Sequence, residues 1–159
     1  MQRVSGLTLL LTRRHADISH PGHVCFPGGR RDPEDSSPEA TALREAEEEI
    51  ALPRSRVEIL GRLGDYVTHS GYRIVPVISL VRPPLELVPR PGEVEETLEI
   101  PLAHALCSGS YRLGRIATDG AHFFLRYQET VVSGPTVSLL MGFYEDLLRT
   151  HSSPGATPS

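Results

Sequence analysis

Short apolar runs bounded by glycine and proline recur along the chain and predict β-strands. The runs at residues 7–12 and 24–26 are apolar and branched enough for short buried strands. Three later runs lie between Gly-rich or Pro-rich turns and are also typical of strands, at residues 57–60, 72–81 and 121–127. Pro76 lies inside one of them, which indicates a sheet edge or a bulge because proline has no backbone N–H to donate.

Helical signals occur in two places. Ser37, Pro38 and Glu39 offer a cap, a proline for the first helical position and an early acid, so we expect a helix over residues 38–50 that Pro53 ends. Apolar residues at helical spacing predict a second helix over residues 137–148. Between these helices, residues 83–92 form a proline-punctuated connection. The last nine residues, 151–159, are polar, and we expect a disordered tail.

The predicted elements extend from residue 7 to residue 148, and we expect a single domain over residues 1–150. The length of 159 residues and the hydrophobic fraction of 39% suit one domain with a single sizeable core. The formal charge of −4 argues against a general nucleic-acid coat, because such a protein needs surplus cations to displace counterions from phosphates.

Charge is distributed unevenly along the chain. All 16 basic residues are arginines, and residues 1–31 hold five of them against Asp17 alone, a local balance of +4 that leaves −8 for the remainder. A basic N-terminal region beside an acidic remainder suits an anionic ligand held partly by arginines and partly by a metal ion. Scattered, solvated surface charge is the alternative.

The cysteine content and the hydropathy restrict the cellular setting. Cys25 and Cys107 are too few for a disulfide framework and lack the spacing of a zinc site. No apolar stretch approaches the roughly 20 residues of a membrane span, so we expect no membrane partner and a cytoplasmic location.

A cluster of carboxylates on the first predicted helix is the main candidate for chemistry. At roughly 100° per residue, Glu45, Glu48 and Glu49 share one face, while Ala46 and Ile50 belong to an apolar stripe that can dock on a sheet. Carboxylate oxygens on a rigid element are the ligands that Mg²⁺ or Mn²⁺ prefers. A solvated acidic face is the competing interpretation.

The residues around this helix resemble a known motif. Arg44 to Glu49 match the R-E-U-x-E-E core of the Nudix box, G-x5-E-x7-R-E-U-x-E-E-x-G-U, in which U is aliphatic. Ala51 stands where the box has its last glycine, and 14 residues separate Gly29 from Arg44 where the box has 13. Glu34 and Asp35 are the substitutes near the first acidic position of the box.

The flanking segments are similar to one Nudix subgroup, the coenzyme A pyrophosphatases. Residues 10–14 and 20–29 resemble its L-L-T-x-R and H-x-G-x-V-x-F-P-G-G signatures, and residues 87–102 are similar as well. His15 stands where the subgroup has Ser or Ala, and the Trp of a C-terminal W-G-x-T segment is missing. The chain starts only a few residues before its first strand.

This resemblance implies a Nudix α/β/α sandwich with a mixed central sheet, shortened at its N-terminus. It implies metal-dependent hydrolysis of the diphosphate of coenzyme A or acyl-CoA, a small-molecule nucleotide substrate. Glu45, Glu48 and Glu49 would hold Mg²⁺ or Mn²⁺, and Glu45, Glu93 or Glu96 would take the proton from water.

Arg44 lies one turn before Glu48, and from this helical spacing we expect it to orient that carboxylate. The resemblance adds residues that would bind the substrate. Arg14, Gly28, Gly29 and Arg30 are the expected substrate-binding residues. Three alternatives stay open: a Nudix hydrolase for another nucleoside diphosphate derivative, one for a nucleoside triphosphate, and a Nudix-shaped binding module without turnover. Association into a homodimer is also open.

Overall fold

The computed structural model describes residues 6–116 and 120–152. Its strands are β1 (Thr8–Arg14), β2 (Val24–Cys25), β3 (Val57–Arg62), β4 (Tyr66–Val67), β5 (Arg73–Ile74), β6 (Val77–Val81), β7 (Val94–Pro101), β8 (Tyr111–Ile116), β9 (Gly120–Tyr127) and β10 (Thr130–Val132). Its helices are α1 (Pro38–Ile50), α2 (Leu102–Ala105) and α3 (Pro135–Ser152), with 3-10 turns at Arg54–Arg56 and Ser108–Ser110.

Helix α1 begins and ends through local signals. The Ser37 side chain accepts a hydrogen bond from the Ala40 N–H at 3.1 Å, and Pro38 opens the first turn, which confirms the predicted start. The helix stops because Ala51 adopts a left-handed conformation, with φ of 54°. Its N–H and that of Leu52 then bond back to carbonyls of the last turn. Pro53 lies beyond this cap.

Strand β1 packs on both of its faces. It pairs with β2 on one edge and with β7 on the other, and Leu11 lies opposite Leu98. Because side chains alternate along a strand, Leu9 and Leu11 contact one core while Leu10 contacts a second core on the other face. The β1 strand therefore divides the molecule into two packed layers.

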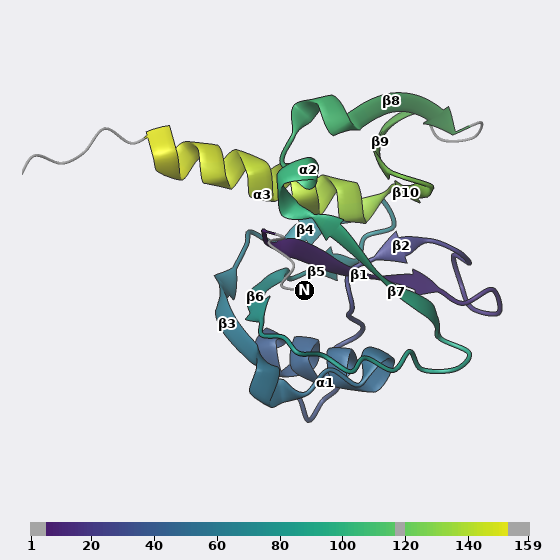
Figure 1. Cartoon of the computed structure of the whole chain (residues 1–159), viewed down its shortest axis with the longest axis vertical. Coiled ribbons are helices and arrows are strands. Elements are labelled where there is room, and N and C mark those ends of the chain that lie inside the picture. The colour runs from purple at the N-terminus through teal and green to yellow at the C-terminus, as the bar shows by residue number, and fades with distance from the viewer. Residues whose placement is uncertain (1–5, 117–119, 153–159) are drawn as a thin grey trace, which may run out of the picture.

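The two cores correspond to the two helical layers. The first joins β1 and β7 to β9, β10, α2 and α3, through Leu11, Val24, Ile100, Ala105, Leu125, Val132, Val137 and Leu140. The second joins α1 to the start of β7, through Ala46, Ile50, Leu52 and Val94. Figure 1 shows α1 on one side of β1 and β7 and α3 on the other, so the α/β/α sandwich is confirmed.

The strand pairing differs from the expected mixed sheet. Every pairing among the described residues is antiparallel, in the orders β2-β1-β7, β10-β9-β8, β3-β6 and β4-β5. The pattern of apolar residues predicts that a strand is buried but carries no information on the direction of its neighbour. In the described part of the chain, no helix is long and apolar enough to cross a membrane.

Other predictions from the sequence need adjustment. The strand expected over residues 72–81 is divided at Val75 and Pro76 into β5 and β6. Strands β4, β7, β8 and β10 were not predicted. Helix α3 starts at Pro135 and continues to Ser152, two residues into the expected tail, and residues 153–159 lie outside the described residues.

Candidate active site

Arg44 on α1 connects the helix to the loop that precedes it. Its guanidinium donates to both Asp35 oxygens, at 3.1 and 3.0 Å, and to the Arg30 carbonyl at 2.9 Å. It also lies 3.0 Å from the Glu45 carboxylate and 3.4 Å from Glu48. The expected contact with Glu48 is present, but the shorter contacts are to Asp35 and Glu45.

The sequence offers Glu34 and Asp35 for the first acidic position of the box, and Asp35 is the one that contacts Arg44. Its side chain is buried and accepts hydrogen bonds from the Thr41 hydroxyl at 2.8 Å and the Asp32 N–H at 2.9 Å, whereas Glu34 is exposed. The Arg44 guanidinium holds the pKa of the Asp35 carboxyl well below its usual range. Asp35 follows Gly29 at the spacing of the box, so the extra residue lies between Asp35 and Arg44.

Gly28 and Gly29, which precede this loop, lie close to two carboxylates of α1. A Cβ on Gly29 would lie 2.4 Å from the Glu45 carboxylate, so only glycine allows this close approach. The Gly28 N–H donates to a Glu49 oxygen at 3.1 Å. The predicted substrate-binding glycines and the predicted metal ligands therefore lie in direct contact.

Glu49 lies in surroundings that oppose its charge. Burial raises the pKa of its carboxyl to about 7, and the nearby charges of Glu45 and Glu93 act in the same direction. The Gly28 N–H and the positive charge of Arg14 act against this rise. The hydrogen bond from Gly28 and the charge of Arg14 are therefore too weak to keep the pKa of Glu49 at its ordinary value.

Arg90 is a second cation at this site, and no local pattern singles it out because it lies in a proline-rich connection. Its guanidinium is 3.9 Å from Glu48 and 3.5 Å from Glu93. Its backbone N–H donates to the Glu49 carbonyl at 2.8 Å, at the carboxyl end of α1. The connection before β7 is therefore part of the site and brings Glu93 to it.

The donor set fits a divalent cation, although no tight metal centre is formed by the side chains. Among residues 6–116 and 120–152, no three or more His, Cys, Asp or Glu side chains are gathered closely enough to hold a metal ion. Glu45 and Glu48 instead contact Arg44, and Glu49 accepts from Gly28. Three hard oxygen donors on one helix face, one with a raised pKa, are nevertheless suited to Mg²⁺ or Mn²⁺.

The arginines of the N-terminal region already have partners within the protein. Arg13 pairs with Glu96 at 2.7 Å, and Arg31 donates to the Asp35 carbonyl at 2.9 Å. Arg14 donates to the carbonyl and hydroxyl of Ser19, at 2.7 and 3.3 Å, and so fixes the loop after β1.

Arg30 donates to the Tyr72 hydroxyl at 3.0 Å. Neither Arg14 nor Arg30 forms an ion pair with a described residue, although the charge of Arg14 acts on Glu49 and on the Cys25 thiol.

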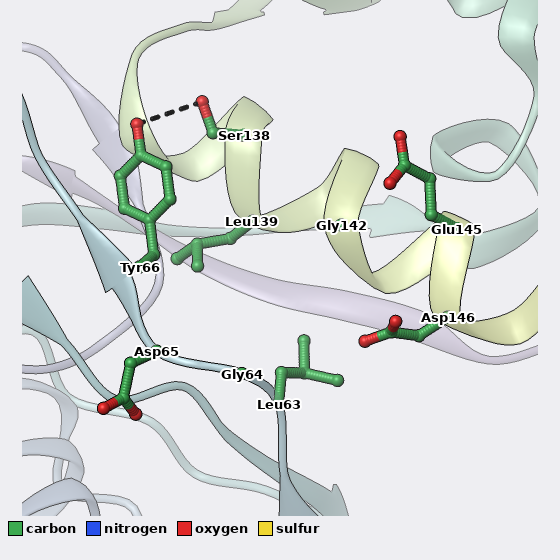
Figure 2. A pocket seen from close by; sticks show the side chains of 9 residues that line it. All are labelled: Leu63, Gly64, Asp65, Tyr66, Ser138, Leu139, Gly142, Glu145 and Asp146. Carbon is green, nitrogen blue, oxygen red and sulfur yellow. Dashed lines mark hydrogen bonds between the residues drawn. The ribbon is translucent and has the colours of Figure 1, made fainter.

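A cavity elsewhere on the molecule contains none of the predicted site residues. Figure 2 shows it between the segment that enters β4 and one side of α3, with the Tyr66 hydroxyl and Ser138 joined at 3.4 Å. Its acidic side chains on α3, Glu145 and Asp146, lie 3.8 and 3.6 Å from Arg149. One arginine is thus shared between two carboxylates, and among the described residues this cavity holds no cluster of three side chains able to bind a metal ion.

Comparison with known sequences places the chain among the Nudix proteins. A NUDIX domain family model matches residues 2–113. The chain is 42% identical over 137 residues to an uncharacterized Nudix hydrolase NudL of Photorhabdus laumondii, covering 84% of this chain and 73% of that protein. A NudL protein of Yersinia pestis, also described as uncharacterized, is 39% identical over 137 residues, covering 84% of this chain and 69% of that protein.

Solved structures agree on the fold. A Nudix hydrolase from M. smegmatis, RenU, superposes with a TM-score of 0.58 at 18% identity, over 95% of this chain and 80% of that chain. A C. elegans Ap4A hydrolase in a binary complex gives 0.57 at 19% identity, over 89% and 88%. At these identities the likeness concerns the fold alone.

Proposed function

The chain belongs to the Nudix hydrolase family, and from this premise we propose that it hydrolyses the diphosphate of coenzyme A or acyl-CoA. It is a pyrophosphohydrolase, and its substrate is a small-molecule nucleotide. The products would be 3′,5′-bisphosphoadenosine and 4′-phosphopantetheine or its acylated form. The substrate rests on residues outside the box itself.

One observation carries the substrate proposal. The segment that resembles the coenzyme A pyrophosphatase signature ends at Gly28 and Gly29, and these two residues contact Glu49 and Glu45. The loop at the start of that segment is held by Arg14, whose charge also acts on Glu49. The signature segment and the carboxylates thus lie in contact, and a segment that recognises the substrate must lie beside the residues that act on it.

We assign the metal to the carboxylate face of α1. Glu45, Glu48 and Glu49 would hold the ion, with the Gly29 carbonyl as a further oxygen donor. When bound, Mg²⁺ or Mn²⁺ would neutralise the diphosphate and lower the pKa of a water molecule. Arg44 lies 3.0 Å from the Glu45 carboxylate and would hold it in place, and the same carboxylate lies close to Gly29.

The proton of the attacking water must pass to a carboxylate within hydrogen-bond reach. Glu96 is a poor candidate because Arg13 holds its carboxylate at 2.7 Å. Glu93 is better placed, since its charge acts on Glu49 and its only described ion pair, with Arg90, is long at 3.5 Å. We therefore propose Glu93 as the base, with Glu45 as the alternative.

Two arginines are available for the extra phosphate of coenzyme A. Arg14 and Arg30 form no ion pair with a described residue, so both can bind a 3′-phosphate without breaking one. Arg13 is less available because of its contact with Glu96.

A metal-dependent hydrolysis screen tests this proposal. The substrates are coenzyme A, acetyl-CoA, dephospho-CoA, ADP-ribose, NADH and nucleoside triphosphates, with products identified by mass. We expect coenzyme A to be cut fastest and dephospho-CoA to be cut more slowly. Equal rates on these two would show that the arginines do not read the 3′-phosphate, and a preferred triphosphate would replace the substrate. No turnover on any substrate would favour a binding module.

A further inference from the structure

Tyr72 presents an exposed aromatic ring close to the candidate active site. The side chain lies just before β5 and is 58% exposed, although it is a large hydrophobic residue. Its backbone is fixed by a tight turn, in which the Thr68 N–H donates to the Tyr72 carbonyl at 2.8 Å. The Thr68 hydroxyl accepts from the Tyr72 N–H at 3.0 Å. The ring is therefore held on a defined support while it faces solvent.

Arg30 covers part of this ring. The centre of its guanidinium lies 5.5 Å from the ring centroid, a cation–π distance, and one of its nitrogens donates to the Tyr72 hydroxyl at 3.0 Å. The carbonyl of Arg30 in turn accepts from Arg44 at 2.9 Å, and Arg44 contacts Glu45 and Glu48. The ring is thus connected through two residues to the carboxylates of α1.

We infer that Tyr72, backed by Arg30, is the platform on which the nucleobase of the substrate stacks. A flat, exposed ring offers a stacking surface to any base, and the neighbouring Arg30 cation attracts the phosphates of the same nucleotide. A nucleotide whose diphosphate lies at the carboxylates has such a base at one end. The inference rests on the proposed function only in taking the substrate to be a nucleotide.

Binding of two matched probes tests the platform. AMP carries adenine where ribose 5-phosphate carries the anomeric hydroxyl, and neither contains the diphosphate anhydride that the enzyme cuts. Their dissociation constants are measured by calorimetry with the whole chain and with three variants. Tyr72→Ala removes the ring, and Tyr72→Phe removes only the hydroxyl that bonds Arg30. Phe123→Ala removes an exposed ring on β9, a strand that packs with α3 on the opposite side of β1 from α1.

The wild type should bind AMP more tightly than ribose 5-phosphate. Tyr72→Ala should weaken AMP binding by about tenfold, leave ribose 5-phosphate unchanged and raise the KM for the nucleotide substrate more than it lowers kcat. Tyr72→Phe and Phe123→Ala should behave as the wild type. Equal affinity of the wild type for both probes, or an unchanged AMP affinity in Tyr72→Ala, would overturn the inference.

The test separates this inference from the proposed function. If coenzyme A is not hydrolysed but Tyr72→Ala loses the preference for AMP, the platform stands and only the substrate changes. If coenzyme A is hydrolysed and Tyr72→Ala binds both probes as the wild type does, the substrate stands and the base lies elsewhere. Circular dichroism of each variant verifies that the fold is intact, as expected for an exposed side chain.

Discussion

Glu49 combines burial with a position beside other carboxylates, and this makes it the first residue to change. Glu49→Gln keeps the shape of the side chain but removes an anionic oxygen donor, so turnover should fall by about two orders of magnitude or more. Glu47→Gln is the matched control, because Glu47 lies on the same helix but is exposed and contacts Arg54 at 2.9 Å. The measurement is kcat at saturating Mg²⁺, and near-normal turnover of Glu49→Gln would remove Glu49 from the metal ligands.

Glu93 and Glu96 lie three residues apart and allow a direct test of the base. Glu93→Gln should lower kcat by about 10²-fold to 10⁴-fold, since proton transfer from water loses its acceptor. Glu96→Gln should leave kcat nearly unchanged because Arg13 already holds that carboxylate. The profile of kcat against pH checks the assignment. A large loss in Glu96→Gln, or none in Glu93→Gln, would return the role to Glu45.

Single site residues can be predicted from the sequence where their motif lies within one helix or loop. The three glutamates of α1 were identifiable because helical spacing alone places them on one face. Asp35 was one of two candidates, and only the contact with Arg44 distinguishes it from Glu34. Arg90 and Tyr72 could not be found, because each reaches the site through tertiary packing of a segment distant from the box.

At the scale of elements, Arg44 joins α1 to the loop before it. Arg44→Lys keeps the charge but cannot hold both oxygens of Asp35 and the Arg30 carbonyl together. The Mg²⁺ concentration for half-maximal rate should therefore rise by about tenfold or more, because Glu45 loses its fixed orientation. Arg54→Lys, at an exposed ion pair with the same helix, is the control. An unchanged Mg²⁺ requirement together with unchanged turnover would make Arg44 a purely structural residue.

The carboxyl end of α1 carries a residue that is unfavourable for its conformation. Ala51 has φ of 54°, where a Cβ is strained and glycine is not. Ala51→Gly should therefore raise the free energy of unfolding by about 1 kcal/mol. Ala42→Gly, inside the same helix, should lower it by about 0.5 to 1 kcal/mol. Urea unfolding followed by circular dichroism measures the free energy of unfolding of both variants. A lower value for Ala51→Gly than for the wild type would contradict backbone strain at Ala51.

The elements differ in how far the sequence predicts them. The predicted bounds of helix α1 are confirmed; its start is predictable because the cap and the first-turn proline are local signals, whereas its end is set by the left-handed Ala51 and not by Pro53. Strand β7 was missed although it is the principal partner of β1, since its polar residues hide the alternation of Leu98 and Ile100, and an irregularity in the pairing places Val94 in the other core. Its stability comes from β1 and the two cores, which the local sequence does not reveal.

At the scale of the whole molecule, an ion pair connects helix α1 to strand β3. Glu39, in the first turn of α1, accepts two hydrogen bonds from Arg62 at the end of β3, at 2.5 and 2.7 Å. The pair links α1 to the β3-β6 ribbon, which lies beside the helix (Figure 1). Arg62 lowers the pKa of the Glu39 carboxyl to about 2, well under the ordinary value for glutamate.

This depressed pKa makes the contribution of the pair to stability depend on pH. A carboxyl whose pKa is lower in the folded state stabilises the fold above its unfolded pKa, about 4.3, and loses that effect as the pH falls toward about 2. Arg62→Gln should therefore be less stable than the wild type at pH 5 to 7, and the difference should shrink between about pH 4.5 and 2.

Urea unfolding of both proteins across this range tests the linkage. Other acid-sensitive groups such as Asp35 are common to both proteins, so their effects cancel in the difference. Arg54→Gln, which breaks an exposed pair on the same helix, should change stability little at any pH in this range. A difference between Arg62→Gln and the wild type that stays constant from pH 7 to pH 2 would mean that Arg62 stabilises the fold through packing of its alkyl chain and not through the charge of Glu39.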